Sequence, residues 1–93
     1  MEFLVRIRVD FPPDMPSEQL ADVMEREKAR GRELKDAGTI VRIWRIPGRR
    51  ENVAIWKGEN ADAIHDAIQS LPVFPWIDAD VTALATHHLE APH

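Results

Sequence analysis

Residues 39–56 read TIVRIWRIPGRRENVAIW, and this stretch decides the fold. Thr39 to Ile46 is rich in β-branched and apolar side chains, residues 47–51 are typical of a turn, and Asn52 to Trp56 is apolar again. Two apolar runs separated by a turn that contains Pro-Gly indicate a β-hairpin. The sequence therefore predicts two paired strands in the middle of the chain.

A strand and a helix precede the hairpin. Residues 3–11 alternate apolar and polar side chains with a period of two, which predicts a strand that ends at Pro12-Pro13. Ser17 is the expected N-cap of a helix that ends at Gly38. Its stripe of inward positions recurs every three or four residues and comprises Leu20, Val23, Met24, Glu27, Gly31 and Leu34.

A second helix and a last strand follow the hairpin. Asn60 is expected to cap a short helix whose apolar face ends at Leu71, just before Pro72. Residues 76–84 alternate again, as in a strand. The order β-α-β-β-α-β predicts an α+β, ferredoxin-like domain, in which two helices cover one face of a four-stranded antiparallel sheet.

Length and composition predict one domain over residues 1–93, with a tail from about residue 87 that is loose or interfacial. The net charge of -4 argues against a nucleic-acid partner. The absence of cysteine excludes disulfides and thiolate chemistry, which suits the cytoplasm, and no apolar run is long enough to span a membrane. We therefore expect a cytoplasmic protein without a membrane or nucleic-acid partner.

The first strand of the hairpin is apolar on both of its expected faces. Ile40, Trp44 and Ile46 alternate with Val41 and Ile43. A sheet that is apolar on both sides needs a second cover, and at this length another subunit is the expected source. The sequence thus predicts a homo-oligomer.

Glu27 is the most informative candidate for chemistry, because it occupies an apolar position on the first helix. A carboxylate in that environment is costly, and burial raises its pKa toward the range useful for a general acid or base. The alternatives are a structural salt bridge to Lys28, Arg30 or a strand arginine, or a side chain that reaches the edge of the stripe.

Two arginines within the apolar strand could bind a carboxylate. Arg42 is expected on the face of Ile40 and Trp44, and Arg45 on the opposite face. A guanidinium offers a flat bidentate fork to a substrate carboxylate, although an interface ion pair is the alternative for both residues. The tryptophans, including Trp44, are expected to pack in the core or an interface, with a place in a pocket wall as the alternative.

A metal site is not expected. The chain has four histidines and no cysteine, and no two histidines have the spacing of helical metal ligands.

Several short motifs together resemble the muconolactone delta-isomerase family from Met1 to about His87. They are Glu27-Lys28, Gly38-Thr39, Trp44-Arg45-Ile46 with Gly48 and Asn52, His65-Asp66, and the run from Leu71 to Trp76 that leads into Asp78. The resemblance implies a 1,3 proton shift, without cofactor or metal, that converts muconolactone into 3-oxoadipate enol-lactone in the β-ketoadipate route of aromatic degradation. It also implies large homo-oligomeric rings, commonly decamers, with pockets at subunit contacts.

The resemblance implies roles for individual residues as well. Glu27 would carry the proton, while Lys28, Asn52 and Arg45 would stabilise the dienolate or hold the substrate carboxylate. Arg42 and Trp44 complete the expected substrate-binding set.

The chain departs from the family pattern at three places. Leu4 stands where the family typically has histidine, Val41-Arg42-Ile43 replaces an Arg-His-Leu run, and Arg49-Arg50 replaces His-Tyr. The alternatives are therefore a paralogue that acts on a related lactone or enone acid, an oligomeric domain without catalysis, and a cofactor-free oxygenase or cyclase of the ferredoxin-like type.

Overall fold

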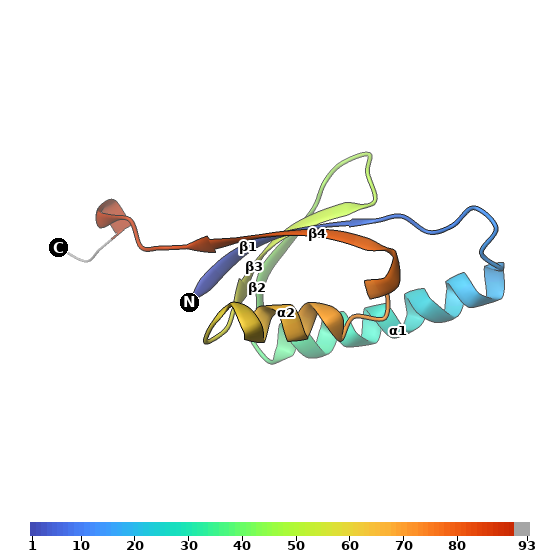
Figure 1. Cartoon of the computed structure of the whole chain (residues 1–93), viewed down its shortest axis with the longest axis horizontal. Coiled ribbons are helices and arrows are strands. Elements are labelled where there is room, and N and C mark those ends of the chain that lie inside the picture. Colours follow the sequence, from blue (N-terminus) through green and yellow to red (C-terminus); the bar gives the residue numbers. More distant parts are fainter. Residues whose placement is uncertain (91–93) are drawn as a thin grey trace.

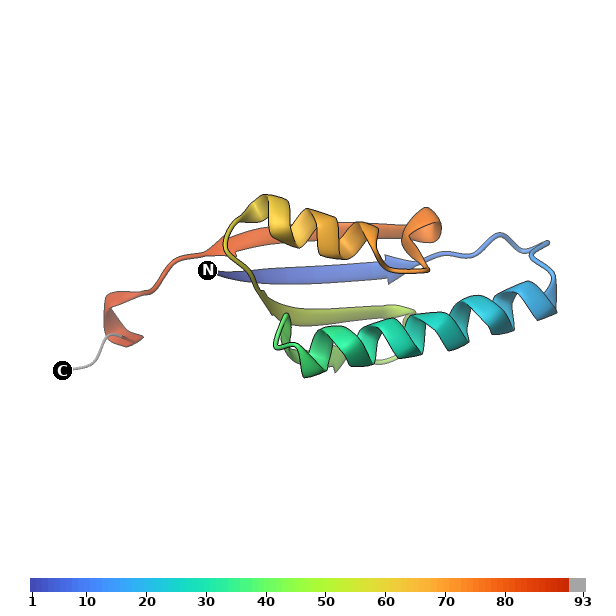
Figure 2. The same cartoon turned by 90° about the horizontal axis from the view of Figure 1, so that it is seen from below.

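Two helices lie on one face of a four-stranded antiparallel sheet in the computed structural model, which describes residues 1–90 (Figures 1 and 2). The strands are arranged in the order β2-β3-β1-β4. This confirms the ferredoxin-like βαββαβ prediction. In chain order the elements are β1 (Glu2–Val9), α1 (Ser17–Asp36), β2 (Ile40–Arg45), β3 (Glu51–Lys57), α2 (Ala61–Gln69) and β4 (Ile77–Leu84), with short 3-10 turns at Phe74–Trp76 and His88–Glu90.

The helix ends follow from local chemistry, with one correction. The side chain of Asn60 accepts a hydrogen bond from the backbone N–H of Ala63 at 2.9 Å, so its predicted role as the cap of α2 is confirmed. Gly38 adopts a φ of 81° just beyond α1, a conformation that favours glycine. Ser17 is not the N-cap of α1. It is the first helical residue, and Pro16 occupies the cap with extended backbone and no side-chain hydrogen bond.

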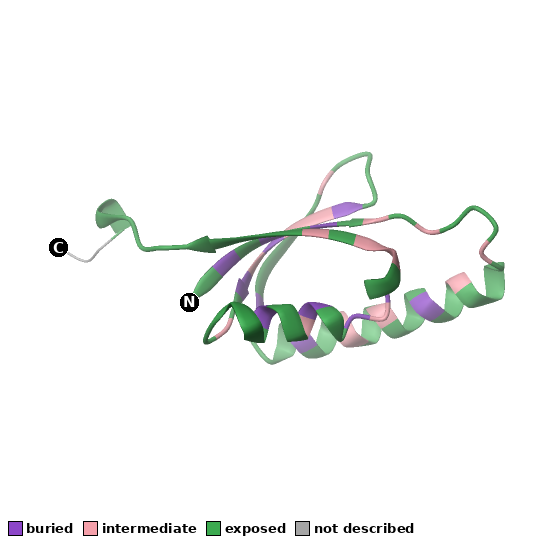
Figure 3. Cartoon of the chain, viewed as in Figure 1, coloured by how far each residue is buried: buried purple, intermediate pink, exposed green. Residues whose placement is uncertain are grey.

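The core lies between the helices and the facing side of the sheet (Figure 3). Full burial of a large apolar side chain contributes about 1.5–3 kcal/mol, so the inward residues of β1 and β3 supply much of the stability. The buried Trp56 has an indole Nε1 with no partner among the described residues. The other large side chains at the centre of this core are Phe3, Val5, Val23 and Ile64.

A β-bulge changes which residues of β2 share a face. The register against β3 shifts between Ile40 and Arg42. As a result Ile40, Ile43 and Arg45 lie opposite the β3 residues that face the helices, while Arg42 and Trp44 lie on the open face. The expectation that Arg42 shares a face with Ile40 is therefore wrong. One extra residue in the strand inverts the alternation that follows it.

The open face of the sheet and the C-terminal tail are uncovered in the single chain. Leu4, Trp44 and Leu84 are among the large apolar side chains exposed there. Residues 85–90 extend away from the sheet and are exposed throughout (Figure 1). Among residues 1–90, neither helix has the length and apolar character needed to cross a membrane.

Candidate active site

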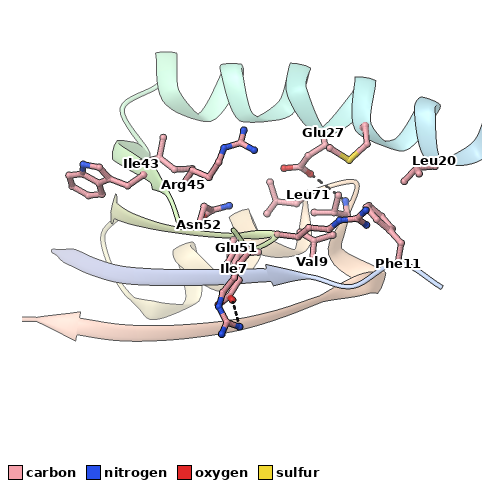
Figure 4. Close-up of a pocket in the computed structure, with 15 residues that line it drawn as sticks. Ile7, Val9, Phe11, Leu20, Glu27, Ile43, Arg45, Glu51, Asn52 and Leu71 are labelled. Carbon is pink, nitrogen blue, oxygen red and sulfur yellow. Dashed lines mark hydrogen bonds and ion pairs between the residues drawn. The ribbon is translucent and has the colours of Figure 1, made fainter. Parts of the chain in front are cut away.

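A cavity of about 570 Å³ opens between α1 and the end of the sheet where β1 and β3 meet the hairpin turn (Figure 4). This size falls within the range of small-molecule sites, and its walls are mainly apolar with a few charged groups. The lining comprises Ile7, Val9, Phe11, Leu20, Met24, Glu27, Ile43, Trp44, Arg45, Arg49, Arg50, Glu51, Asn52, Leu71 and Val73.

Glu27 projects from α1 into this cavity (Figure 4). Its Oε1 accepts a hydrogen bond from the backbone N–H of Val73 at 3.3 Å, which ties the carboxylate to the segment after α2. Burial raises the pKa of Glu27, and the Val73 hydrogen bond opposes this effect only in part. No ion pair within residues 1–90 includes Glu27, and Arg30 instead contacts Glu33 and Ser70. The geometry thus provides a half-buried carboxylate above an apolar pocket, one of the arrangements that suits a general base.

Arg45 and Asn52 form a polar pair on the sheet side of the pocket. They are direct cross-strand partners in β2 and β3, and both line the cavity. Asn52 Oδ1 is buried and has no hydrogen-bond partner among the described residues. Because the oxygen and nitrogen of an amide can exchange places by a flip, Asn52 can present either an acceptor or a donor to a bound molecule. A guanidinium beside a side-chain amide is suited to holding a carboxylate or a lactone carbonyl.

Glu51 is the centre of an arginine cluster behind the pocket. Its side chain is only 2% exposed, and its oxygens lie 3.1 Å from Arg6, 3.8 Å from Arg8 and 3.4 Å from Arg49. Burial raises the pKa of Glu51, but the hydrogen bond from Arg6 and the charges of the arginines outweigh it, so the pKa is lowered overall. Arg50 also lines the pocket. Sequence reasoning did not select these pocket residues, and its one signal for them was the Arg49-Arg50 departure from the family pattern.

The other predicted site residues are divided between the pocket and the surface. Trp44 lines the pocket, whereas Lys28 is exposed on α1 and is not part of the lining. The guanidinium of Arg42 lies 4.9 Å from the centre of the Trp44 ring on the open face of the sheet. The structure therefore brings Glu27, Arg45 and Asn52 together. Trp44 borders the pocket from the edge strand, but its ring lies with Arg42 on the open face, and Lys28 lies outside.

Candidate metal ligands do not gather within the described part of the chain. Residues 1–90 contain no cluster of three or more histidine, cysteine, aspartate or glutamate side chains suited to holding a metal ion. The rings of His87 and His88 lie 4.2 Å apart, centre to centre, in the exposed tail.

The fold and the pocket define a ferredoxin-like domain in which a half-buried carboxylate, Glu27, projects into an apolar cavity edged by arginines. The family model for muconolactone delta-isomerase matches residues 1–90. The chain is 37% identical to muconolactone delta-isomerase 2 of Acinetobacter lwoffii over 87 residues, which cover 94% of this chain and 91% of the relative. The muconolactone delta-isomerase of Cupriavidus pinatubonensis is also 37% identical, with 94% and 95% covered.

A crystal structure of muconolactone isomerase superposes with a TM-score of 0.90 at 31% identity, and the match covers 100% of this chain and 96% of that chain. The chain belongs to the muconolactone delta-isomerase family. The resemblance found in the sequence is thereby confirmed.

Proposed function

We propose that this chain is a cytoplasmic isomerase of aromatic degradation, which converts muconolactone or a close analogue into the enol-lactone by a 1,3 proton shift without cofactor or metal. The observation that carries the proposal is Glu27, a half-buried carboxylate with a raised pKa that projects into an apolar pocket edged by Arg45 and Asn52. The relatives named above, at up to 37% identity, support the same reaction class.

The proton shift uses Glu27 as both base and acid. Its ionised carboxylate removes the proton from C4, the ring carbon that carries the carboxymethyl arm. The C4–H electron pair becomes the new C3–C4 double bond, and the former C2–C3 double-bond pair moves between C1 and C2. The π pair of the C1 carbonyl moves onto the carbonyl oxygen. Return of the proton from Glu27 to C2, on the same face of the ring, restores the carbonyl and leaves the double bond transposed. One carboxyl group is sufficient because the proton that it takes is the proton that it returns.

Arg45 and Asn52 hold the substrate carboxylate in this proposal. Their cross-strand pairing supplies a fork of N–H donors and an amide that can donate beside it. Trp44 borders the pocket from the edge strand β2, with its ring on the open face of the sheet. Lys28 and Arg42 lie outside this pocket, so a role for either in substrate binding requires a pocket completed by another subunit.

The proposed assembly is a homo-oligomer larger than a dimer, as the family resemblance implies. The exposed apolar side chains of the open sheet face, including Leu4 and Trp44, support it, as does the extended tail with Leu89 73% exposed. A second copy could cover both surfaces.

The test is an ultraviolet assay of the purified protein with muconolactone, repeated in excess chelator. We expect conversion to the enol-lactone at the same rate with and without chelator, and no oxygen uptake with quinol substrates. No conversion of muconolactone, but turnover of another lactone, would favour the paralogue with a different substrate. Chelator-sensitive conversion would refute the metal-free mechanism, and oxygen uptake would favour the oxygenase alternative.

A further inference from the structure

Two guanidinium groups of the pocket lack a counter-charge. Three arginines line the cavity, but Arg49 is paired with Glu51 at 3.4 Å. No ion pair within residues 1–90 includes Arg45 or Arg50. Within residues 1–90 the pocket therefore presents two cations and one carboxylate, Glu27, without ion-pair partners, while its second carboxylate, Glu51, is held by arginines.

The backbone of Arg50 is joined to the end of β1 that leads into the segment holding Glu27. Its carbonyl accepts a hydrogen bond of 2.9 Å from the N–H of Val9. The N–H of the next residue, Asp10, donates at 2.8 Å to the carbonyl of Trp76. Three residues before Trp76, the N–H of Val73 donates to Glu27. This succession of backbone contacts connects Arg50 to the segment that holds the carboxylate.

Arg45 enters the pocket from a different element. It lies on the edge strand β2, and Figure 4 shows Ile43 and Arg45 on one side of Glu27, with Val9 below it and Phe11 on the other side. The two uncompensated cations thus enter the pocket from separate places along its length.

We infer that Arg50 is an oxyanion-stabilising residue. Its guanidinium stabilises the negative charge on the carbonyl oxygen of the dienolate, while Arg45 holds the substrate carboxylate. This inference rests on the proposed function. In a butenolide of this kind, the carbonyl and the carboxymethyl arm are attached to the two carbons on either side of the ring oxygen, so they point away from each other. Two cations that enter the pocket from separate places match these two groups, with Glu27 above the ring.

The charges of Glu27, Arg45, Arg50 and the substrate balance among themselves at each stage of the reaction. Before proton transfer, ionised Glu27 and the two guanidiniums sum to one positive charge, which the substrate carboxylate neutralises. After transfer Glu27 is neutral and the two guanidiniums face two negative charges, the carboxylate and the dienolate oxygen. Since an uncompensated charge in an apolar pocket is costly, the second arginine offsets the charge that appears only in the intermediate.

Arg50 differs from Arg49, its neighbour in the turn, in its ion pairing. Arg49 is engaged by Glu51, which it shares with Arg6 and Arg8 on the side of the arginine cluster. Arg50 makes no such contact with residues 1–90, and its guanidinium charge remains available to the pocket.

The experiment compares Arg50→Gln and Arg50→Lys with Arg32→Gln in steady-state kinetics with muconolactone. Arg32 is exposed on α1 and does not line the pocket, so its variant removes the same charge without touching the site. Loss of one oxyanion donor typically lowers kcat by about 10²–10³. We expect a loss of this size for Arg50→Gln with little change in KM, partial recovery in Arg50→Lys, and wild-type kinetics for Arg32→Gln. All three variants should keep the wild-type melting temperature, because Arg50 makes no ion pair with residues 1–90.

Each other outcome has one interpretation. Arg50→Gln with normal kcat and a raised KM would show that Arg50 binds the ground state only, and kinetics equal to those of Arg32→Gln would show that Arg50 does not act in the site. Either result would overturn the inference and leave the proposed function intact. Absence of turnover by the wild type would refute the proposed function itself, and the role of Arg50 with it.

Discussion

Replacement of Glu27 by glutamine tests the chemistry of the pocket most directly. The variant keeps the shape of the side chain, and its amide oxygen can still accept the 3.3 Å hydrogen bond from Val73. It lacks only the basic oxygen that collects the proton. Removal of a general base typically slows the chemical step by about 10²–10⁴. At about 1.36 kcal/mol for each factor of ten, this corresponds to roughly 2.7–5.4 kcal/mol of lost transition-state stabilisation.

The effect of Glu27→Gln on folding should be small and should depend on pH. A hydrogen bond to a neutral acceptor is weaker than one to a charged acceptor by about 1 kcal/mol, but the variant also escapes the cost of burying a carboxylate. Because burial raises the folded-state pKa of Glu27, the wild type loses stability as pH rises from the unfolded pKa through the folded pKa. The glutamine variant has no such loss. Its stability relative to the wild type should therefore improve from acidic to neutral pH.

Turnover and thermal denaturation measured on one preparation decide between chemistry and structure. We expect kcat to collapse while the melting temperature stays within about 4–8 °C of the wild type, the shift that 1 kcal/mol produces in a domain of this size. Loss of a partner from a buried ion pair would instead cost about 3–5 kcal/mol, and activity would fall only in step with folded protein. A stable variant with near-normal turnover would show that Glu27 is not the proton carrier.

Three further predictions concern pH, the arginine cluster and the assembly. The kcat/KM of the wild type should fall as pH decreases through the raised pKa of Glu27, because the protonated acid cannot accept a proton; an acidic limb at the ordinary pKa of glutamate would contradict this. Glu51→Gln should lower the melting temperature at neutral pH. Since the folded-state pKa of Glu51 is lowered, its contribution is present above the unfolded pKa and is lost as pH falls through the folded pKa, so an equal deficit at acidic and neutral pH would argue against the ion-pair cluster. Light scattering should return an oligomer larger than a dimer, and a particle of 10.6 kDa would refute the proposed assembly.

Much of the fold was predictable because its signals are local. Alternation over residues 3–11, the apolar stripe before Gly38 and the Pro-Gly turn of the hairpin each depend on neighbours within a few positions. The order of these elements then limits the topology to a few arrangements. Glu27 was found by the same kind of signal, as a carboxylate on an otherwise apolar stripe. Its role as the proton carrier stays a prediction.

The register of β2 and the polar contacts of the pocket depend on tertiary structure. The bulge after Ile40 leaves no mark in the alternation, yet it moves Arg42 to the open face. Whether α1 directs Lys28 toward the cavity or toward solvent depends on the rotation of the helix against the sheet. The contact of the Glu27 carboxylate with the segment after α2 is likewise absent from the local pattern of the helix.

The sequence by itself determined the elements, their order and the one acid on an apolar stripe, because hydrophobic periodicity and turn chemistry act between residues that are near in the chain. Only the tertiary structure decided which charges meet. The pairing of Glu51 with Arg6 joins residues 45 positions apart, and the contact of Glu27 with Val73 joins residues 46 positions apart. Such contacts depend on how whole strands and helices pack, and side-chain type alone does not specify them. Arg50, which lines the pocket and has no ion-pair partner within residues 1–90, is identified as a candidate by that packing and by no motif of its own.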